Sequence, residues 1–389
     1  MSKPVTPCFI LDADRLRSNV EALRKGLSAR FSSSAVAYSL KTNSSPAMLE
    51  VVRDCGCWAE VVSYTEYALA IEMGFKRSHI VYNGPMKSKE SFEDALNAGA
   101  VVNIDTKREL DWLAAMPHRQ EPYRVGLRVN LNLMEISPDD CRPGEEYSRF
   151  GFSEKDGEFE DALERLHAMP GVSLCGLHLH RTSLTRSLEV YSHIAAYAAG
   201  IISTYSLNLS YVDIGGGYFG DMPGKPSFRD YADAIASGLG SRDITVIVEP
   251  GNALAASAFS FRTSVIDAKT VSGVRLLVCD GSRNDVDPFF RKKDYFKTFL
   301  FDGSDRPLEP LQQVVGCTCL ENDRLFSLVD SARLEPGDEM EFSSVGAYTM
   351  ALSPLFIRYF PRVYVKSGGD IELYSEEWNE KDYLKKNGI

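Results

Sequence analysis

The chain has 389 residues, 44% hydrophobic and 25% charged, and its formal net charge is −11 with a pI near 5.2. This composition is typical of a globular protein, and the acidic balance argues against a general nucleic-acid-binding protein, which would need a basic face. Asp12 and Asp14 interrupt any signal-peptide core near the start, and no window approaches the roughly 18 uncharged apolar residues of a membrane span. We therefore expect a soluble, cytoplasmic protein with mostly reduced cysteines and no nucleic-acid or membrane partner.

Short apolar and β-branched runs alternate with helix-like segments along residues 12–255. The runs are residues 35–40, 58–63, 79–84, 101–105, 124–130, 174–180, 211–217 and 244–250. Because the segments between them carry apolar residues at three- and four-residue steps, the pattern indicates parallel βα units. Eight such strands predict a (β/α)8 barrel over residues 12–255, with an open doubly wound sheet as the alternative and a long inserted loop within residues 131–173.

The sequence pattern changes after about residue 255. From there on, β-like runs are separated by turns, without regular helices between them. Residues 256–389 are therefore predicted to form a second, all-β domain of sandwich or barrel type, joined by the strand-like residues 1–11. The cysteine pairs Cys55-Gly-Cys57 and Cys317-Thr-Cys319 do not have the spacing of zinc ligands, so no metal site is expected.

Polar residues gather where the predicted barrel strands end. They are Lys41, Glu60, Ser63, Asn83, Asp105, Arg128, Asn130, His178, His180, Gly215, Gly216, Gly217 and Glu249. In such barrels the carboxyl ends of the strands form the active-site face, so these side chains should meet at one mouth.

Three of these features together indicate a cofactor. A glycine run after the seventh strand is either a simple turn or a backbone cradle for phosphate. Lys41 is either a solvated lysine or a partly desolvated amine able to form a Schiff base. Glu249 is a carboxylate that can face a ring nitrogen, and the combination points to pyridoxal 5'-phosphate (PLP).

The motifs "YSLKTN", "HLHRTS", "VDIGGGY", "VEPGN", "GCTCLENDRL" and "GAYT" follow one another in this order. Together they resemble the ornithine/diaminopimelate decarboxylase family, the fold-type III PLP-dependent decarboxylases. The resemblance implies an alanine-racemase-like barrel with a β domain, PLP as cofactor, and a head-to-tail homodimer with shared active sites.

The same resemblance implies a role for particular residues. Lys41 corresponds to the Schiff-base lysine, His180 to the residue that stacks on the cofactor ring, and Glu249 to the partner of the ring nitrogen. The implied cofactor-binding set also contains Ser183, Gly216, Gly217, Gly251 and Tyr348. Cys319 is either a small hydrophobe or, as the resemblance implies, the proton donor supplied by the other subunit. Arg149 would form an ion pair with Asp323 of the partner subunit.

The chain departs from the family pattern near the phosphate. Asn252 stands where the family has an arginine after "EPG", and Arg181 follows His180 in a neighbouring loop. We hypothesise that Arg181 replaces the missing phosphate charge; the alternative is an arginine that faces solvent.

Further departures concern the substrate. Leu320 follows Cys319 where an acidic residue usually binds a distal ammonium group, and Asp287-Pro288 replaces Arg-Pro. Cys317 also replaces a proline. We therefore expect Asp287, Leu320 and Asp323 near the substrate, with Asp287 facing a cationic tail.

The favoured function is a PLP-dependent carboxy-lyase that removes the α-carboxylate of an amino acid or amino-acid-bearing metabolite, for example a siderophore or peptide-antibiotic precursor. The alternatives are diaminopimelate decarboxylase in lysine biosynthesis, a PLP-dependent amino-acid racemase, or a binding protein that has lost the cofactor. Glu249 and Cys319 favour decarboxylation, because racemases of this fold tend to pair the ring nitrogen with arginine.

Overall fold

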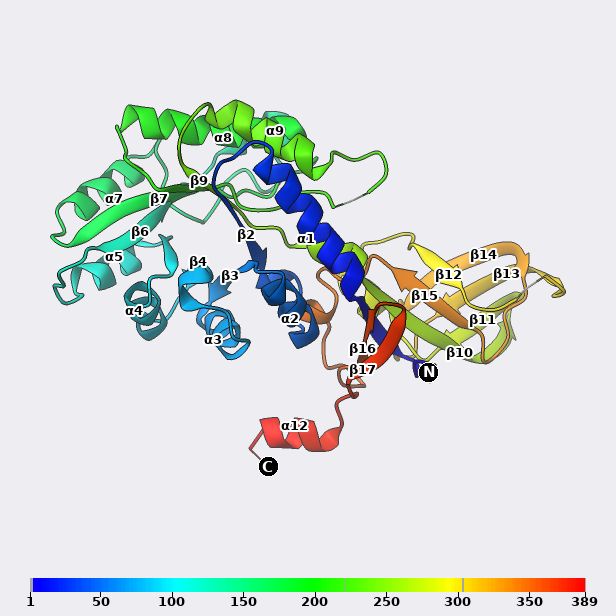
Figure 1. Cartoon of the computed structure of the whole chain (residues 1–389). Coiled ribbons are helices and arrows are strands. Elements are labelled where there is room, and N and C mark those ends of the chain that lie inside the picture. The colour runs from blue at the N-terminus through cyan, green and yellow to red at the C-terminus, as the bar shows by residue number, and fades with distance from the viewer. Residues whose placement is uncertain (1–2, 221, 303, 389) are drawn as a thin grey trace. The chain divides into compact units, whose positions relative to one another are not determined.

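The computed structural model describes residues 3–220, 222–302 and 304–388 (Figure 1). The chain divides into two compact units. The barrel unit contains residues 18–41 and 49–254, and the sheet unit contains residues 1–17, 42–48 and 255–389.

Eight parallel strands close into a barrel, in chain order. The strands are β2 (Ser34–Ser39), β3 (Trp58–Ser63), β4 (Ile80–Met86), β5 (Val101–Ile104), β6 (Tyr123–Arg128), β7 (Val172–His178), β8 (Tyr211–Asp213) and β9 (Thr245–Val248). The last strand pairs with the first, since Val246 of β9 lies opposite Ser34 of β2. The (β/α)8 prediction is therefore confirmed, and the open sheet is excluded.

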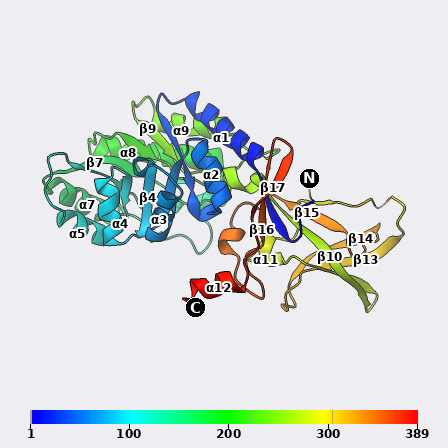
Figure 2. The same cartoon turned by 60° about the horizontal axis from the view of Figure 1, so that its bottom comes forward.

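Helices follow the strands and lie outside them (Figure 2). They are α1 (Ala13–Ser28), α2 (Pro46–Asp54), α3 (Tyr64–Glu72), α4 (Lys89–Asn97), α5 (Lys107–Ala114), α6 (Leu133–Ile136), α7 (Glu158–His167), α8 (Leu188–Thr204), α9 (Phe228–Leu239) and α10 (Asn252–Ala255). Serine caps start several of them, because Ser63, Ser88, Ser187 and Ser227 each accept a hydrogen bond from a backbone N–H of the first turn.

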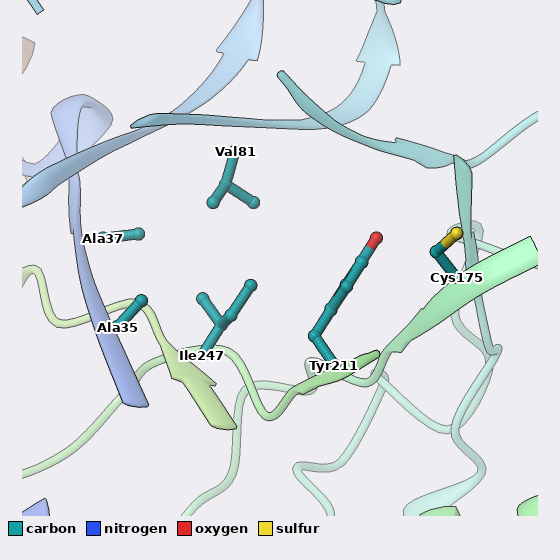
Figure 3. Close-up of a cluster of buried hydrophobic side chains, with 6 residues drawn as sticks. All are labelled: Ala35, Ala37, Val81, Cys175, Tyr211 and Ile247. Carbon is teal, nitrogen blue, oxygen red and sulfur yellow. The ribbon is translucent and has the colours of Figure 1, made fainter. Parts of the chain in front are cut away.

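Small residues and one tyrosine fill one layer of the barrel interior. Ala35, Ala37, Val81, Cys175, Tyr211 and Ile247 form a buried cluster there (Figure 3). A Cβ added at Gly176 would lie 2.1 Å from a ring atom of Tyr211. The Tyr211 ring therefore occupies space that side chains on β6 and β7 leave free, and the glycines make this close approach possible.

The sheet unit is mainly β-structure, as predicted. Its strands are β1 (Cys8–Asp12), β10 (Phe259–Val271), β11 (Val274–Cys279), β12 (Lys297–Phe299), β13 (Leu308–Val315), β14 (Arg324–Ala332), β15 (Glu339–Ser343), β16 (Arg362–Ser367) and β17 (Asp370–Ser375). The N-terminal strand β1 lies between β10 and β16, antiparallel to the first and parallel to the second.

Two helices in the sheet unit were not anticipated from the sequence, which suggested turns alone. They are α11 (Arg283–Val286) and α12 (Glu380–Lys386). Asn379 caps α12, and the Asp382 side chain accepts from the Asn379 N–H in return, which completes a capping box. Among the described residues, no helix combines the length and the apolar character needed to cross a bilayer.

The packing of Tyr211 predicts a strong difference between two glycines. Gly176→Ala should lower the free energy of unfolding by about 1–3 kcal/mol, because its methyl group would overlap the Tyr211 ring. Gly200→Ala is the matched control, since its Cβ would meet nothing within 4 Å in α8 and alanine favours a helix by up to about 1 kcal/mol. Urea unfolding measures both, and equal effects of the two substitutions would contradict the packing described here.

Candidate active site

Eight of the thirteen predicted strand-end residues line one cavity of about 690 Å³. They are Lys41, Glu60, Ser63, Asn83, Arg128, His178, His180 and Glu249, whereas Asp105, Asn130 and the three glycines are not part of its lining. The inserted loop contributes residues 144, 145 and 147–150, and Arg181 and Thr182 also line the cavity. The cavity thus combines one amine, two buried carboxylates and two imidazoles in a single space.

The amine of Lys41 is held by a buried carboxylate. Lys41 lies in a short 3-10 turn directly after β2, and its Nζ lies 2.6 Å from Oε2 of Glu60. The lysine side chain is 37% exposed, whereas the Glu60 side chain is 1% exposed. Ser39 donates to the same carboxylate oxygen at 2.5 Å. This ion pair keeps the amine at the cavity, within reach of a bound molecule.

A second buried carboxylate, Glu249, lies in a cluster of acid–base groups. Asn83 Nδ2 donates to Glu249 Oε1 at 2.5 Å, and His178 Nε2 lies 3.6 Å from Glu249 Oε2. Burial favours a raised pKa for Glu249, but the charges of His178 and Lys41 outweigh it and hold the pKa below its ordinary value. Burial and the charge of Glu249 raise the pKa of Asp213 well above its ordinary value. The two pKa values therefore move in opposite directions, so Asp213 takes up a proton more readily than Glu249 does.

The ligand atoms of His178, Asp213 and Glu249 lie within 4.8 Å of one another, a spacing that a metal ion could also use. Metal ligands bind in their deprotonated form, whereas burial and the neighbouring carboxylate favour the protonated form of Asp213. The cluster instead offers one fixed negative charge in a dry environment, which suits a protonated ring nitrogen.

His180 presents a neutral ring to the cavity. Burial lowers the pKa of His180 to about 3, and its Nδ1 accepts a hydrogen bond from the Gly216 N–H at 3.2 Å. Its ring lies nearly parallel to that of His178, with 6.5 Å between the centroids and 7° between the planes. A flat, uncharged imidazole in this place can stack on an aromatic ligand, as predicted for this residue.

The glycine run after β8 needs glycine for geometric reasons. Gly215 and Gly217 have φ angles of 71° and 98°, which favour glycine. A Cβ at Gly216 would lie 2.0 Å from the Glu249 carbonyl oxygen. The loop therefore packs directly against the chain that carries Glu249.

Two other predicted phosphate residues form hydrogen bonds with the loops around them. Ser183 is buried, and its Oγ accepts from the Arg186 N–H at 3.0 Å. The guanidinium of Arg181 donates to the Glu145 carbonyl oxygen in the inserted loop. Gly251 directly precedes α10, which begins at Asn252. The observed Arg181 contact therefore joins two walls of the cavity, and its predicted role toward phosphate stays a prediction.

Cys319 and Leu320 lie on the turn between β13 and β14 in the sheet unit. Cys319 is exposed, and Leu320 is 39% exposed. Asp323 is buried beneath this turn, where it accepts hydrogen bonds from Ser282 Oγ, the Arg283 N–H, the Thr318 N–H and Thr318 Oγ1 at 2.6–3.1 Å. Asp323 therefore anchors the loop of Cys319, and its two predicted roles, a substrate contact and an ion pair with Arg149 of the partner subunit, stay predictions.

Asp287 also has a local role in the structure. Its side chain is 5% exposed and forms an ion pair with Arg283 at 3.0 Å. The backbone N–H groups of Arg291 and Lys292 donate to it at 3.1 and 2.9 Å. These contacts stabilise the loop after α11, and the predicted role of Asp287 toward a cationic tail stays a prediction. Tyr348, a predicted phosphate ligand in the same unit, is 41% exposed.

Sequence reasoning missed the residues beneath the carboxylates. Asp213 belongs to the glycine motif but received no role, and Asn103 and Tyr211 were treated as parts of strands. The available signal was polarity, because Asn103 and Asp213 interrupt otherwise apolar runs and are both completely buried. Buried polar groups need partners, so such positions indicate a hydrogen-bond network.

The side chains present fit PLP. Both ring nitrogens of His178 and Oδ2 of Asp213 are buried without a hydrogen-bond partner among the described residues. The cavity also holds a lysine amine, an ionised carboxylate and a neutral histidine ring, which are the groups needed for the aldehyde, the ring nitrogen and the ring face.

Comparison with known proteins identifies the class. Residues 14–256 match the family described as pyridoxal-dependent decarboxylase, pyridoxal binding domain. The chain therefore belongs to this family, its cofactor is PLP, and it is an amino-acid decarboxylase.

Individual relatives carry the comparison further. The chain is 26% identical over 360 residues to a diaminopimelate decarboxylase of Helicobacter pylori, covering 90% of this chain and 87% of that protein. A solved structure of diaminopimelate decarboxylase from the same organism, complexed with L-lysine, shares the fold with a TM-score of 0.83 at 23% identity, covering 100% of this chain and 98% of its own. The arginine decarboxylase of Paramecium bursaria Chlorella virus also shares it, with a TM-score of 0.77 at 21% identity, covering 93% of this chain and 96% of its own.

The lowered pKa of His180 predicts how the apoprotein responds to acid. Below pH 6.5, the unfolded chain takes up a proton at this histidine, whereas the folded chain does so only near pH 3. The free energy of unfolding should therefore fall as the pH drops through this window, by up to about 1.4 kcal/mol per pH unit from this group. His180→Asn should show a shallower fall than the wild type in urea unfolding. An unchanged slope in His180→Asn would exclude a buried neutral histidine.

Proposed function

We propose that this decarboxylase removes the α-carboxylate of an amino acid whose remote end differs from that of ornithine or diaminopimelate, and that Lys41, His180, Glu249 and Cys319 carry the chemistry. The observation that carries the proposal is the cavity of the barrel unit, where the Lys41 amine contacts a buried carboxylate and Glu249 is held ionised.

Each cavity side chain has a task in this proposal. Lys41 attaches the cofactor through its amine, and Glu60 keeps that amine in place. His180 covers the ring face, and Glu249 keeps a proton on the ring nitrogen by its negative charge. Ser183, Gly216, Gly217, Gly251 and Tyr348 would bind the phosphate, with Arg181 as an added positive charge. When bound, PLP supplies the electron sink for the pair of electrons left at Cα after CO2 departs.

The proton that returns to Cα is assigned to a thiol. Cys319 is exposed on a turn that Asp323 anchors, so the thiol can be offered to a second chain. We propose a homodimer in which Cys319 of the partner subunit reaches the cavity. The neighbouring Leu320 offers apolar surface, which cannot form a charge-assisted contact with a distal ammonium group.

Diaminopimelate decarboxylation in lysine biosynthesis is the second candidate, and it is favoured by the names of the curated relatives. An amino-acid racemase is disfavoured, because Glu249 strengthens the electron sink that supports loss of CO2. We place the enzyme in the cytoplasm, where its eight cysteines, all free in the structure, would stay reduced.

The attachment of the cofactor can be tested by colour. The purified protein should show the visible absorbance of bound PLP, and Lys41→Ala should lose that band while its thermal unfolding stays cooperative. The matched control is Lys89→Ala, which changes an exposed lysine and should keep the band. Lys87 is not suitable as a control, because it forms a buried ion pair with Glu109. A band that persists in Lys41→Ala would overturn the assignment of Lys41.

The reaction and the role of the thiol can be tested together. CO2 release should be measured over ornithine, arginine, meso-diaminopimelate and larger amino-acid conjugates, and we expect the highest kcat/KM outside the first three. Cys319→Ala should lower kcat for the best substrate by at least about 10²-fold, because a general acid is lost. Release of no CO2, with exchange of the Cα hydrogen into solvent, would establish the racemase instead.

A further inference from the structure

A chain of hydrogen bonds runs through the barrel interior to the two buried carboxylates. The Tyr211 hydroxyl donates to Asn103 Oδ1 at 2.7 Å, and Asn103 Nδ2 donates to Asn83 Oδ1 at 2.8 Å. Asn83 Nδ2 then donates to Glu249 Oε1 at 2.5 Å and to Glu60 Oε1 at 3.2 Å. Four strands, β8, β5, β4 and β3, and the segment after β9 are thus joined by side chains alone.

The two carboxylates decide which partner donates in every hydrogen bond of this series. An ionised carboxylate only accepts hydrogen bonds, so Asn83 must turn its amide NH2 toward Glu60 and Glu249. Its amide oxygen then faces Asn103, which must donate, and the Asn103 oxygen is left to accept from Tyr211. The hydroxyl at the far end therefore locks the orientation of both amides.

Gly126 on β6 leaves room for this series of hydrogen bonds. A Cβ at Gly126 would lie 2.0 Å from Asn103 Oδ1 and 2.1 Å from the Tyr211 hydroxyl. The hydroxyl points into the barrel interior, away from the backbone of β8 (Figure 3). A larger residue at position 126 would displace the contact between Tyr211 and Asn103. The hydrogen bond therefore depends on the glycine.

The residues in this series of hydrogen bonds are buried, so water cannot replace a lost donor. Asn103 is completely buried, Asn83 and Glu60 are each 1% exposed, and Tyr211 is 8% exposed. In such a dry environment a misdirected amide would leave a carboxylate without a donor, and that raises the carboxylate pKa.

We propose that Tyr211, Asn103 and Asn83 are positioning residues that hold Glu60 and Glu249 in place and link the charge on one carboxylate to the charge on the other. The inference rests on the proposed function, in which Glu60 holds Lys41 and Glu249 faces the ring nitrogen. One amide group of Asn83 serves both carboxylates, so a change at either one alters the donor available to the other.

Other titratable groups face the same carboxylates and act on them in parallel. His178, Asp213 and Lys41 influence Glu249, and Lys41 also contacts Glu60. Partial burial and the charge of Glu60 raise the pKa of the partly buried Glu66. All of these stay in place when Tyr211 changes, so the effect of the hydrogen-bond chain can be separated from theirs.

The sharpest test removes one hydroxyl. Tyr211→Phe keeps the ring that fills the barrel and deletes only the donor to Asn103. The dissociation constant of PLP should rise about five- to tenfold, as expected for one lost buried hydrogen bond near a charged group, and the pH midpoint of the bound cofactor's absorbance should shift. Tyr82→Phe is the matched control, because its buried hydroxyl bonds only Ser91 Oγ among the described contacts, at 2.9 Å. It should lower the melting temperature comparably and leave both cofactor readouts unchanged.

The second test breaks the chain at its branch. Asn83→Leu, of similar size but without a donor, should weaken PLP binding more than Tyr211→Phe does. In the double variant, Tyr211→Phe should add nothing to the cofactor readouts of Asn83→Leu, because the chain is already broken.

Two results would overturn the proposal: a Tyr211→Phe variant that matches Tyr82→Phe in affinity and absorbance midpoint, or fully additive effects in the double variant. Neither result bears on Lys41. Loss of the proposed function itself would appear separately, as a visible band that survives Lys41→Ala.

Discussion

Two carboxylates buried at the mouth of the barrel, Glu60 and Glu249, are the constraint on which the site depends. A buried negative charge is tolerated only where donors or positive charges surround it. Lys41 and Ser39 meet this need for Glu60, and Asn83 and His178 meet it for Glu249. The polar residues around the cavity are therefore linked as one electrostatic arrangement, and the barrel backbone supplies the rigid frame that keeps them together.

The barrel is packed in a way that serves this arrangement. Glycines on β6 and β7 leave room for the ring of Tyr211, and that ring fills the layer beneath the cavity while its hydroxyl begins the hydrogen-bond chain toward Asn83. A single side chain thus contributes both apolar packing and polar orientation. The sheet unit follows the same rule on a smaller scale, since Asp323 and Asp287 are buried acceptors that give their loops a fixed shape.

The acidic residues expected near the substrate have local hydrogen-bond partners in the structure. A carboxylate at Asp287 was expected to face a cationic tail, and Asp323 was expected near the substrate and beside Arg149 of the partner subunit. Both are buried and surrounded by local donors, because a loop with an acidic side chain often satisfies its own backbone N–H groups first. Arg181 and residues of the inserted loop line the cavity of the barrel unit.

The sequence by itself determined the eight-stranded barrel, the sheet-rich second part and the group of polar strand ends, because strand periodicity and strand ends are local properties of the chain. It also pointed to Lys41, His180 and Glu249 as candidate site residues. Only the tertiary structure decided that Glu60 is the partner of Lys41, that the pKa of Asp213 is raised, and that Tyr211 and Asn103 are linked by a hydrogen bond to the residues around the cavity. Those relations join residues as much as 108 positions apart, and hydrogen-bond partners and burial arise only when distant strands meet.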